Sequence, residues 1–127
     1  IVLLNQMFTP TLTVIDAQTA IVNGGPEGML ADGVVTSPGL ILASSDRVAL
    51  DAFGVCMLQD ELSRTDVPDP DARHAMFVST APWSMPQILH ALDLSIDSAR
   101  SHDDVRLRLE GLERAEALSA LFRGTSA

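Results

Sequence analysis

The stretch LILASSDRVALDAFG, residues 40–54, joins a short apolar run to a longer one through a polar corner. Residues 40–43 have the composition of a buried strand. Residues 46–62 are apolar around most of a helical circumference, which predicts a largely buried helix. The stretch therefore predicts a strand that turns directly into a helix, which is the basic unit of an α/β fold.

Polar groups at this corner are the first candidates for a functional site. Ser44 or Ser45 can cap the helix, and Asp46 suits the positive end of its dipole. Asp51 stands alone among apolar neighbours, where an ionised carboxylate needs an arginine, hydrogen bonds or a polar cleft. We interpret Asp46 and Asp51 as candidate catalytic residues and the two serines as candidate ligand-binding residues. Helix capping and a structural ion pair are the alternatives.

A second strand is predicted over residues 11–15, ending at Asp16. Strands that alternate with helices favour a mainly parallel or mixed sheet covered by helices. Ligands of open parallel sheets gather at the carboxyl ends of the strands. If residues 11–15 and 40–43 run parallel, Asp16 and the polar corner lie at one rim. Asp16 is therefore a third candidate catalytic residue, with a local turn as the alternative.

The segment NGGPEG, residues 23–28, contains three glycines and a proline, so it must turn sharply and use positive φ. Its backbone N–H groups could hold an anion, which makes Asn23, Gly24 and Gly25 candidate ligand-binding residues. The segment has neither the Walker pattern nor the full Rossmann spacing. A plain tight turn is the alternative.

The rest of the chain predicts three more elements. Ser84 to Gln87 resembles a capping box with proline in the first turn, opening a helix that ends near Leu92. Residues 105–110 alternate apolar and charged residues, as in a strand with one wet face. A last helix follows and is stopped by Gly124. Residues 63–73 are polar and predict an exposed connection.

Composition excludes several classes of function. The 127 residues suit one α/β domain, 1–127, and no apolar run approaches the ~20 residues that span a bilayer. A net charge of −9 opposes nucleic acid and anionic membranes. All eight basic residues are arginine, which excludes a P-loop or Schiff-base lysine within this chain.

Cysteine and histidine give little support for a metal centre. Cys56 is alone, so the chain holds no iron–sulfur ligand set, and its place in an apolar helix predicts an inert core thiol. His74, His90 and His102 lack metal-ligand spacing. Trp83, next to a proline, is expected to pack in the core. No cofactor or metal is assigned from these residues.

Three strings together resemble the domain-of-unknown-function family 362 (DUF362), in its carboxy-terminal part. They are PTLTVIDAQTAIVNGGPEG (10–28), GLILASSDRVALDAFG (39–54) and PQILHALDLSI (86–96), and the resemblance covers about residues 10–111. The resemblance implies an uncharacterised α/β domain from an iron–sulfur-associated family. The start at Ile1, without methionine, suggests a partial domain that is the carboxy-terminal portion of a larger family domain.

Three hypotheses of function stay open at this stage. One is a redox-associated or metal-binding enzyme with its site around Asp16, the Gly24-Gly25 loop and Asp46. Another is a non-catalytic module that binds a partner or completes a larger core. The third is a small anion-binding domain that uses the glycine loop. A cytoplasmic location and a small-molecule or anion ligand are expected, with association through the missing amino-terminal half or as a homo-oligomer.

Overall fold

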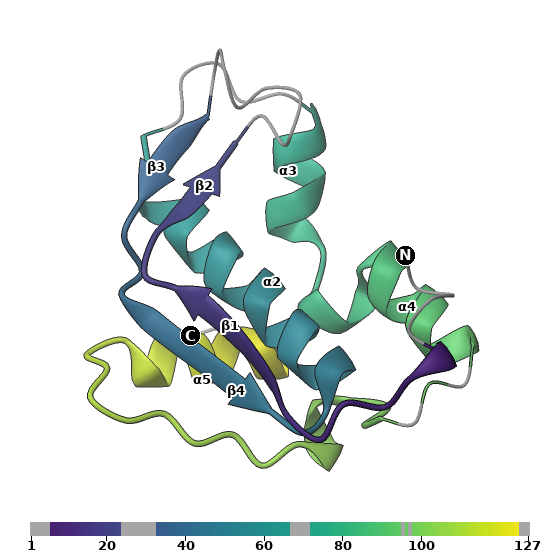
Figure 1. Ribbon diagram of the computed structural model, residues 1–127. Coiled ribbons are helices and arrows are strands. Elements are labelled where there is room, and N and C mark those ends of the chain that lie inside the picture. The colour runs from purple at the N-terminus through teal and green to yellow at the C-terminus, as the bar shows by residue number, and fades with distance from the viewer. Residues whose placement is uncertain (1–5, 24–32, 67–71, 95, 97, 125–127) are drawn as a thin grey trace.

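A computed structural model of the chain describes residues 6–23, 33–66, 72–94, 96 and 98–124 (Figure 1). The strands are β1 (Thr13–Ala17), β2 (Ala20–Val22), β3 (Val34–Thr36) and β4 (Leu40–Ser44). The helices are α2 (Arg47–Arg64), α3 (Ala72–Ser79), α4 (Pro86–Asp93) and α5 (Ala115–Arg123), with 3₁₀ turns η2 (Pro82–Ser84) and η3 (His102–Asp104). The fold is therefore of mixed α/β class, as the sequence predicts.

Helix α2 is the central element, and the other elements pack around it. It contacts β2 and β4 as well as α3, α4 and α5, and eleven of its side chains are buried. Figure 1 shows the strands crossing one side of α2 while α5 runs behind them. The prediction of a largely buried helix after residue 46 is thus confirmed. No helix in the described ranges is long and apolar enough to cross a membrane.

The apolar core lies between α2, η2 and α5, and three aromatic rings form its centre. Phe122 of α5 lies 5.5 Å from Phe53 of α2 and 5.7 Å from Trp83 of η2, measured between ring centroids. Both pairs are tilted, which is a favourable arrangement for aromatic rings. Trp83 packs in the core, as expected.

The strands form two antiparallel pairs, so the prediction of a mainly parallel sheet is wrong. β1 pairs with β4, and β2 pairs with β3. Gly39, with a φ of 70°, donates its N–H to the carbonyl of Gln18 between the two pairs. Antiparallel strands need only a hairpin connection, whereas parallel strands need a long crossover. Along the described residues the chain passes from β1 through β2 and β3 to β4, and β4 returns antiparallel to β1. We call these four strands, β1 to β4, the β ribbon.

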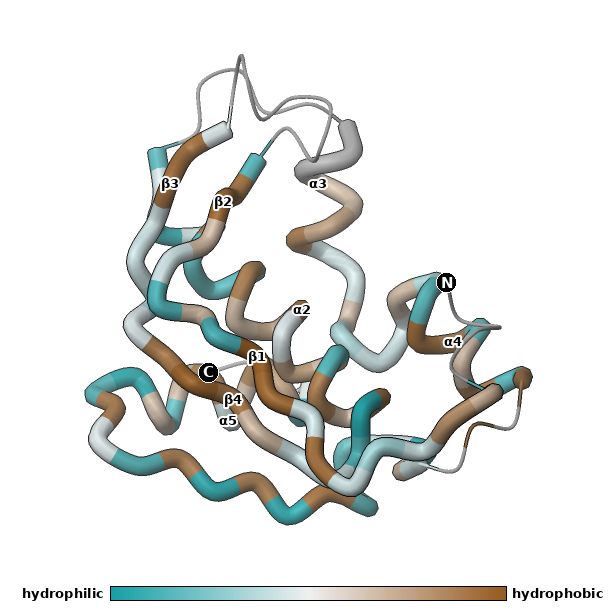
Figure 2. Tube along the Cα trace, viewed as in Figure 1, coloured by the Kyte–Doolittle hydropathy of each residue, from teal (hydrophilic) through white to brown (hydrophobic). Residues whose placement is uncertain are grey.

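Other predicted elements differ from the structure in detail. β1 begins and ends two residues later than predicted. Residues 105–110 do not form a strand, although their exposure alternates as predicted and Figure 2 shows the matching alternation in hydropathy. The capping box at Ser84 is wrong, because Met85 is the N-cap of α4 and makes no side-chain hydrogen bond. Gly124 ends α5 with a φ of 68°, as predicted.

Gly54 in α2 provides a test of how tightly the helix and the ribbon pack. A Cβ atom built at Gly54 would lie 3.8 Å from Ile15 Cδ1, which is an ordinary contact. Gly54→Ala should therefore raise the free energy of unfolding by up to about 1 kcal/mol, the helix-propensity difference between the two residues. Urea denaturation measures the change. A loss of stability would show that α2 needs a closer approach to β1 than the structure has.

Candidate functional site

Asp46 holds the corner between β4 and α2 together through backbone amides. One carboxylate oxygen accepts from the N–H groups of Val48 at 3.0 Å and Ala49 at 2.9 Å, which caps α2. The other accepts from the N–H of Ala99 at 2.5 Å, from a segment 53 residues away. Ser44 Oγ accepts from the Asp46 N–H at 2.9 Å. Asp46, rather than either serine, is the N-cap, and both of its oxygens are engaged.

Asp16 lies away from this corner because β1 and β4 run in opposite directions. It opposes Ile41 in the ladder, whereas Ser44 at the end of β4 opposes Thr13. Three strand residues therefore separate its pairing position from that of Ser44, which is about 10 Å along the strands. The Asp16 side chain accepts from the Gln18 N–H at 3.0 Å, a local turn contact. The structure does not bring Asp16 and Asp46 to one rim.

Of the remaining ligand-binding candidates, Ser45 and Asn23 lie within the described residues. Ser45 is exposed at the corner beside Asp46. Asn23 has a φ of 67°, which confirms positive φ at the start of the glycine segment. Gly24 and Gly25 lie outside the described residues. Their assignment as anion-binding residues stays a prediction.

Asp51 is exposed on α2, although the sequence places it in an apolar run. Desolvation by the surrounding protein raises the pKa of its carboxyl above the ordinary value. One turn earlier, Arg47 donates to the carbonyl oxygen of Phe8 at 2.7 Å and lies 5.7 Å from the centre of its ring. Arg47 thus links the start of α2 to Phe8. A desolvated acid on an accessible surface is a feature that catalytic sites share with structural ones.

Cys56, His90 and His102 form no reactive cluster with the other described side chains. Burial and the nearby charge of Asp60 raise the pKa of the Cys56 thiol to about 12, so the thiol stays protonated at neutral pH. Its Sγ lies 3.4 Å from the carbonyl oxygen of Leu118. His90 is exposed, and His102 lies 3.3 Å from Asp103. Among the described residues, no group of three or more His, Cys, Asp or Glu side chains could hold a metal ion.

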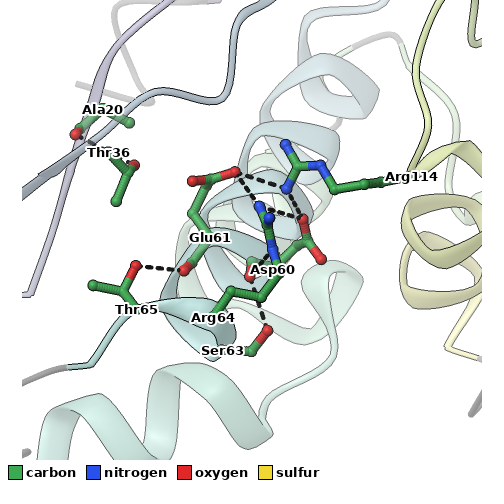
Figure 3. Close-up of polar contacts among 8 residues, drawn as sticks. All are labelled: Ala20, Thr36, Asp60, Glu61, Ser63, Arg64, Thr65 and Arg114. Carbon is green, nitrogen blue, oxygen red and sulfur yellow. Dashed lines mark hydrogen bonds and ion pairs between the residues drawn. The ribbon is translucent and has the colours of Figure 1, made fainter.

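The strongest polar cluster of the described chain was not predicted. Arg114, before α5, donates to carboxylates of Asp60 and Glu61 at the end of α2, the latter at 2.7 Å (Figure 3). Arg64 joins the same cluster, 2.5 Å from Glu61 and 3.2 Å from Asp60. Burial lowers the pKa of the Arg114 guanidinium, but its hydrogen bonds to the two acids outweigh this effect and raise it. The cluster therefore links the residue before α5 to the end of α2 through ion pairs.

Only part of this cluster has a signal in the sequence. Arg64 follows Glu61 by three positions and Asp60 by four. Both are the spacings at which oppositely charged side chains pair on a helix. Arg114 lies 53 residues from Glu61 and gives no local signal. Gln59 was missed for the same reason: it is buried and donates to the carbonyl oxygens of Phe77 at 2.6 Å and Thr80 at 2.7 Å, which fixes the end of α3.

The comparison with known families bears on the amino-terminal part of the chain. Residues 1–56 match the family model described as "Domain of unknown function (DUF362)". The match contains all eight candidate residues, from Asp16 to Asp51. No curated protein and no solved structure matched the chain.

The DUF362 match corrects the extent of the resemblance. It covers the amino-terminal part of this chain and not the carboxy-terminal part. The strings at residues 10–28 and 39–54 fall inside the match, and the string at 86–96 falls outside it. The DUF362 similarity therefore covers the ribbon and the first half of α2, whereas α3, α4 and α5 lie beyond it.

Asp46→Ala should lower the free energy of unfolding by about 1–3 kcal/mol, because it removes the cap of α2 and the contact to Ala99. Asp46→Asn keeps one carbonyl oxygen for the cap and should lose less. Asp16→Ala is the matched control, since it removes an exposed acid from a single turn contact. Equal losses at positions 16 and 46, measured by urea denaturation, would contradict the role given to Asp46.

Arg114→Ala should cost about 2–4 kcal/mol, because it leaves the buried Glu61 carboxylate and its neighbour Asp60 with less neutralising charge. Arg108→Ala is the control: Arg108 pairs with Glu110 on the surface, and its removal should change stability by less than about 0.5 kcal/mol. Thermal and urea unfolding measure both. A loss at Arg114 no larger than that at Arg108 would contradict the anchoring of α5.

Asp51→Asn should change stability in a pH-dependent way. The pKa of Asp51 is higher in the folded than in the unfolded state, because desolvation disfavours its charged form. Asp51 therefore contributes most to stability below its unfolded-state pKa, and this contribution is lost as pH rises through the folded-state pKa. Asn should therefore stabilise the fold slightly near neutral pH, by at most about 0.5 kcal/mol for this exposed group, and have no such effect in acid. A destabilisation that appears only near neutral pH would instead indicate an ionic partner of Asp51.

Proposed function

We propose that this domain is a non-catalytic partner-binding module, whose partner covers the outer face of the β ribbon. The outer sheet face is defined here by Val14 and Asp16 of β1, Ile21 of β2, Val35 of β3 and Ile41 of β4. These residues are exposed and alternate along their strands with residues of lower exposure. The face lies on the side of the ribbon opposite the residues that pack towards α2.

The observation that supports this proposal is the apolar character of the exposed face. An antiparallel sheet with one wet face normally alternates apolar residues inside with polar residues outside. Here Val14 is 55% exposed, Val35 67% and Ile41 70%. Ile21 opposes Val35 directly in the ladder, and Ile41 opposes Asp16. Adjacent apolar side chains on an open face are a mark of a binding surface.

Charge indicates the chemistry of the partner. One acid, Asp16, lies among these apolar side chains, opposite Ile41. Two copies facing each other would bring two such charges together, which opposes association. A polypeptide surface that combines apolar side chains with lysine or arginine matches both features. We therefore assign the outer sheet face to a basic amphipathic partner segment.

The engagement of the candidate acids supports the same proposal. Asp46 accepts hydrogen bonds from three backbone amides, and Asp16 accepts one from the amide of Gln18. These are the contacts expected of a structural role, and none of them leaves the two carboxylates converging on one cleft. The ribbon can therefore serve as a surface without a reaction centre on it.

A second candidate is a redox-associated or metal-binding enzyme of DUF362 type. The family match contains every candidate residue, and Asp51 is a desolvated acid with a raised pKa. On this hypothesis Asp16, Asp46 and Asp51 are the catalytic residues, and Asn23, Gly24, Gly25, Ser44 and Ser45 bind the ligand. The partner-binding hypothesis accounts for more of the described contacts, because it also explains the exposed apolar strands.

The test is a titration with a synthetic amphipathic helical peptide of leucine and lysine, followed by amide chemical shifts. Binding should move the signals of β1, β2, β3 and β4, and a leucine–glutamate peptide should not bind. A triple variant, Val14→Thr, Val35→Thr and Ile41→Thr, should keep its stability within about 0.5 kcal/mol per site and bind at least tenfold more weakly.

Leu89→Gln is the matched control for this titration. Leu89 is 48% exposed on α4, away from the outer sheet face, so its replacement removes an apolar surface side chain without touching the ribbon. Its binding should equal that of the unmodified protein. Peptide binding that survives in the triple variant, or that is lost equally in Leu89→Gln, would overturn the proposal.

A further inference from the structure

We propose a second interaction surface, a slot between β4 and residues 105–110 that accepts one extended peptide strand with acidic side chains. A pocket of about 230 Å³ separates the two segments, and every residue of both lines it. Its floor is apolar and includes Leu50, Phe53 and Phe122. The slot lies at the edge of β4 and shares one residue, Ile41, with the outer sheet face.

Unpaired backbone groups on both sides indicate the kind of occupant. β4 pairs with β1 on one edge, and in the described part of the chain its other edge pairs with no strand. Within the described chain, residues 105–110 make one backbone hydrogen bond, from the Val105 N–H to the His102 carbonyl oxygen. An added strand hydrogen-bonds to a free edge through its main chain, which is a common mode of peptide recognition.

The side chains of residues 105–110 already have the arrangement of a strand. Val105, Leu107 and Leu109 are partly buried against the core, whereas Arg106, Arg108 and Glu110 are exposed. A second hollow is lined by Leu107, Leu109 and residues of α5. The segment therefore borders two hollows, which gives it room to shift until an inserted strand lies about 5 Å from each neighbour.

The charge of Arg106 indicates which extended peptides fit the slot. Arg108 is paired with Glu110, but Arg106 is exposed and makes no ion pair in the described ranges. An inserted strand with alternating side chains would turn one set towards the apolar floor and the other towards the rim beside Arg106. Opposite charges on neighbouring strands stabilise the pair. A strand that alternates apolar and acidic residues fits both faces of the slot.

The experiment uses a heptapeptide of alternating valine and glutamate, titrated into the full chain and followed by amide chemical shifts. Binding should move signals of residues 40–44 and 105–110 and leave the outer face of β2 and β3 unchanged. Two control peptides are expected to bind at least about fivefold more weakly: one with arginine in place of glutamate, and one N-methylated at alternate backbone nitrogens.

Surface variants separate this proposal from a general loss of structure. Arg106→Glu should weaken binding of the glutamate peptide about fivefold or more and strengthen binding of the arginine peptide. Arg100→Glu makes the same change of charge outside the pocket lining and should alter neither. Equal binding by the unmodified protein and Arg106→Glu would overturn the proposal.

Two further results would also overturn it. Contacts between the amides of β4 and residues 105–110 in the free protein would show that the chain closes the slot itself. The same shifts appearing with rising protein concentration, without peptide, would show that a second copy occupies the slot.

Discussion

The carboxylate of Asp46 is the contact on which the rest of the structure depends. It caps α2, and α2 is the element against which the ribbon and the other helices pack. Its second oxygen also holds Ala99, so the segment that leads to residues 105–110 starts from the same corner. One partly buried carboxylate thus fixes both the start of the central helix and the position of Ala99. Arg114 fixes the opposite end of α2 to α5.

The acids at the strands and at the end of α2 have hydrogen-bond or ion-pair partners, whereas several apolar strand side chains are exposed. The acids at the ribbon are engaged by backbone amides, and the acids at the end of α2 are neutralised by arginines. The strands meanwhile expose valine and isoleucine. Covering such a surface lowers the free energy, because apolar area is removed from water. These features are the basis of our proposal that the domain binds another polypeptide.

Local patterns predicted the elements that depend on local interactions. The strand at 40–44, the buried helix after it and the stop at Gly124 follow from hydropathy and from backbone conformation. The acid at position 46 was recognised as suiting the helix start, although serine was preferred as the cap. The alternation at residues 105–110 was also correct, but a strand needs a partner, and alternation alone does not supply one.

Features set by distant residues could not be predicted. Strand direction depends on how the chain returns, so parallel and antiparallel pairing look alike in two isolated apolar runs. That error placed Asp16 beside Asp46, whereas the ladder separates them. The links from Arg114 to Glu61 and from Ala99 to Asp46 each join residues 53 positions apart. Exposure of Asp51 likewise depends on which face of α2 the other elements cover.

Amide hydrogen exchange is the measurement that tests the central role of Asp46 most directly. The N–H groups of Val48, Ala49 and Ala99 should be protected together in the unmodified protein, and Asp46→Ala should accelerate all three while amides in the middle of α2 stay protected. Fast exchange at Ala99 in the unmodified protein, or protection there that survives Asp46→Ala, would contradict the account.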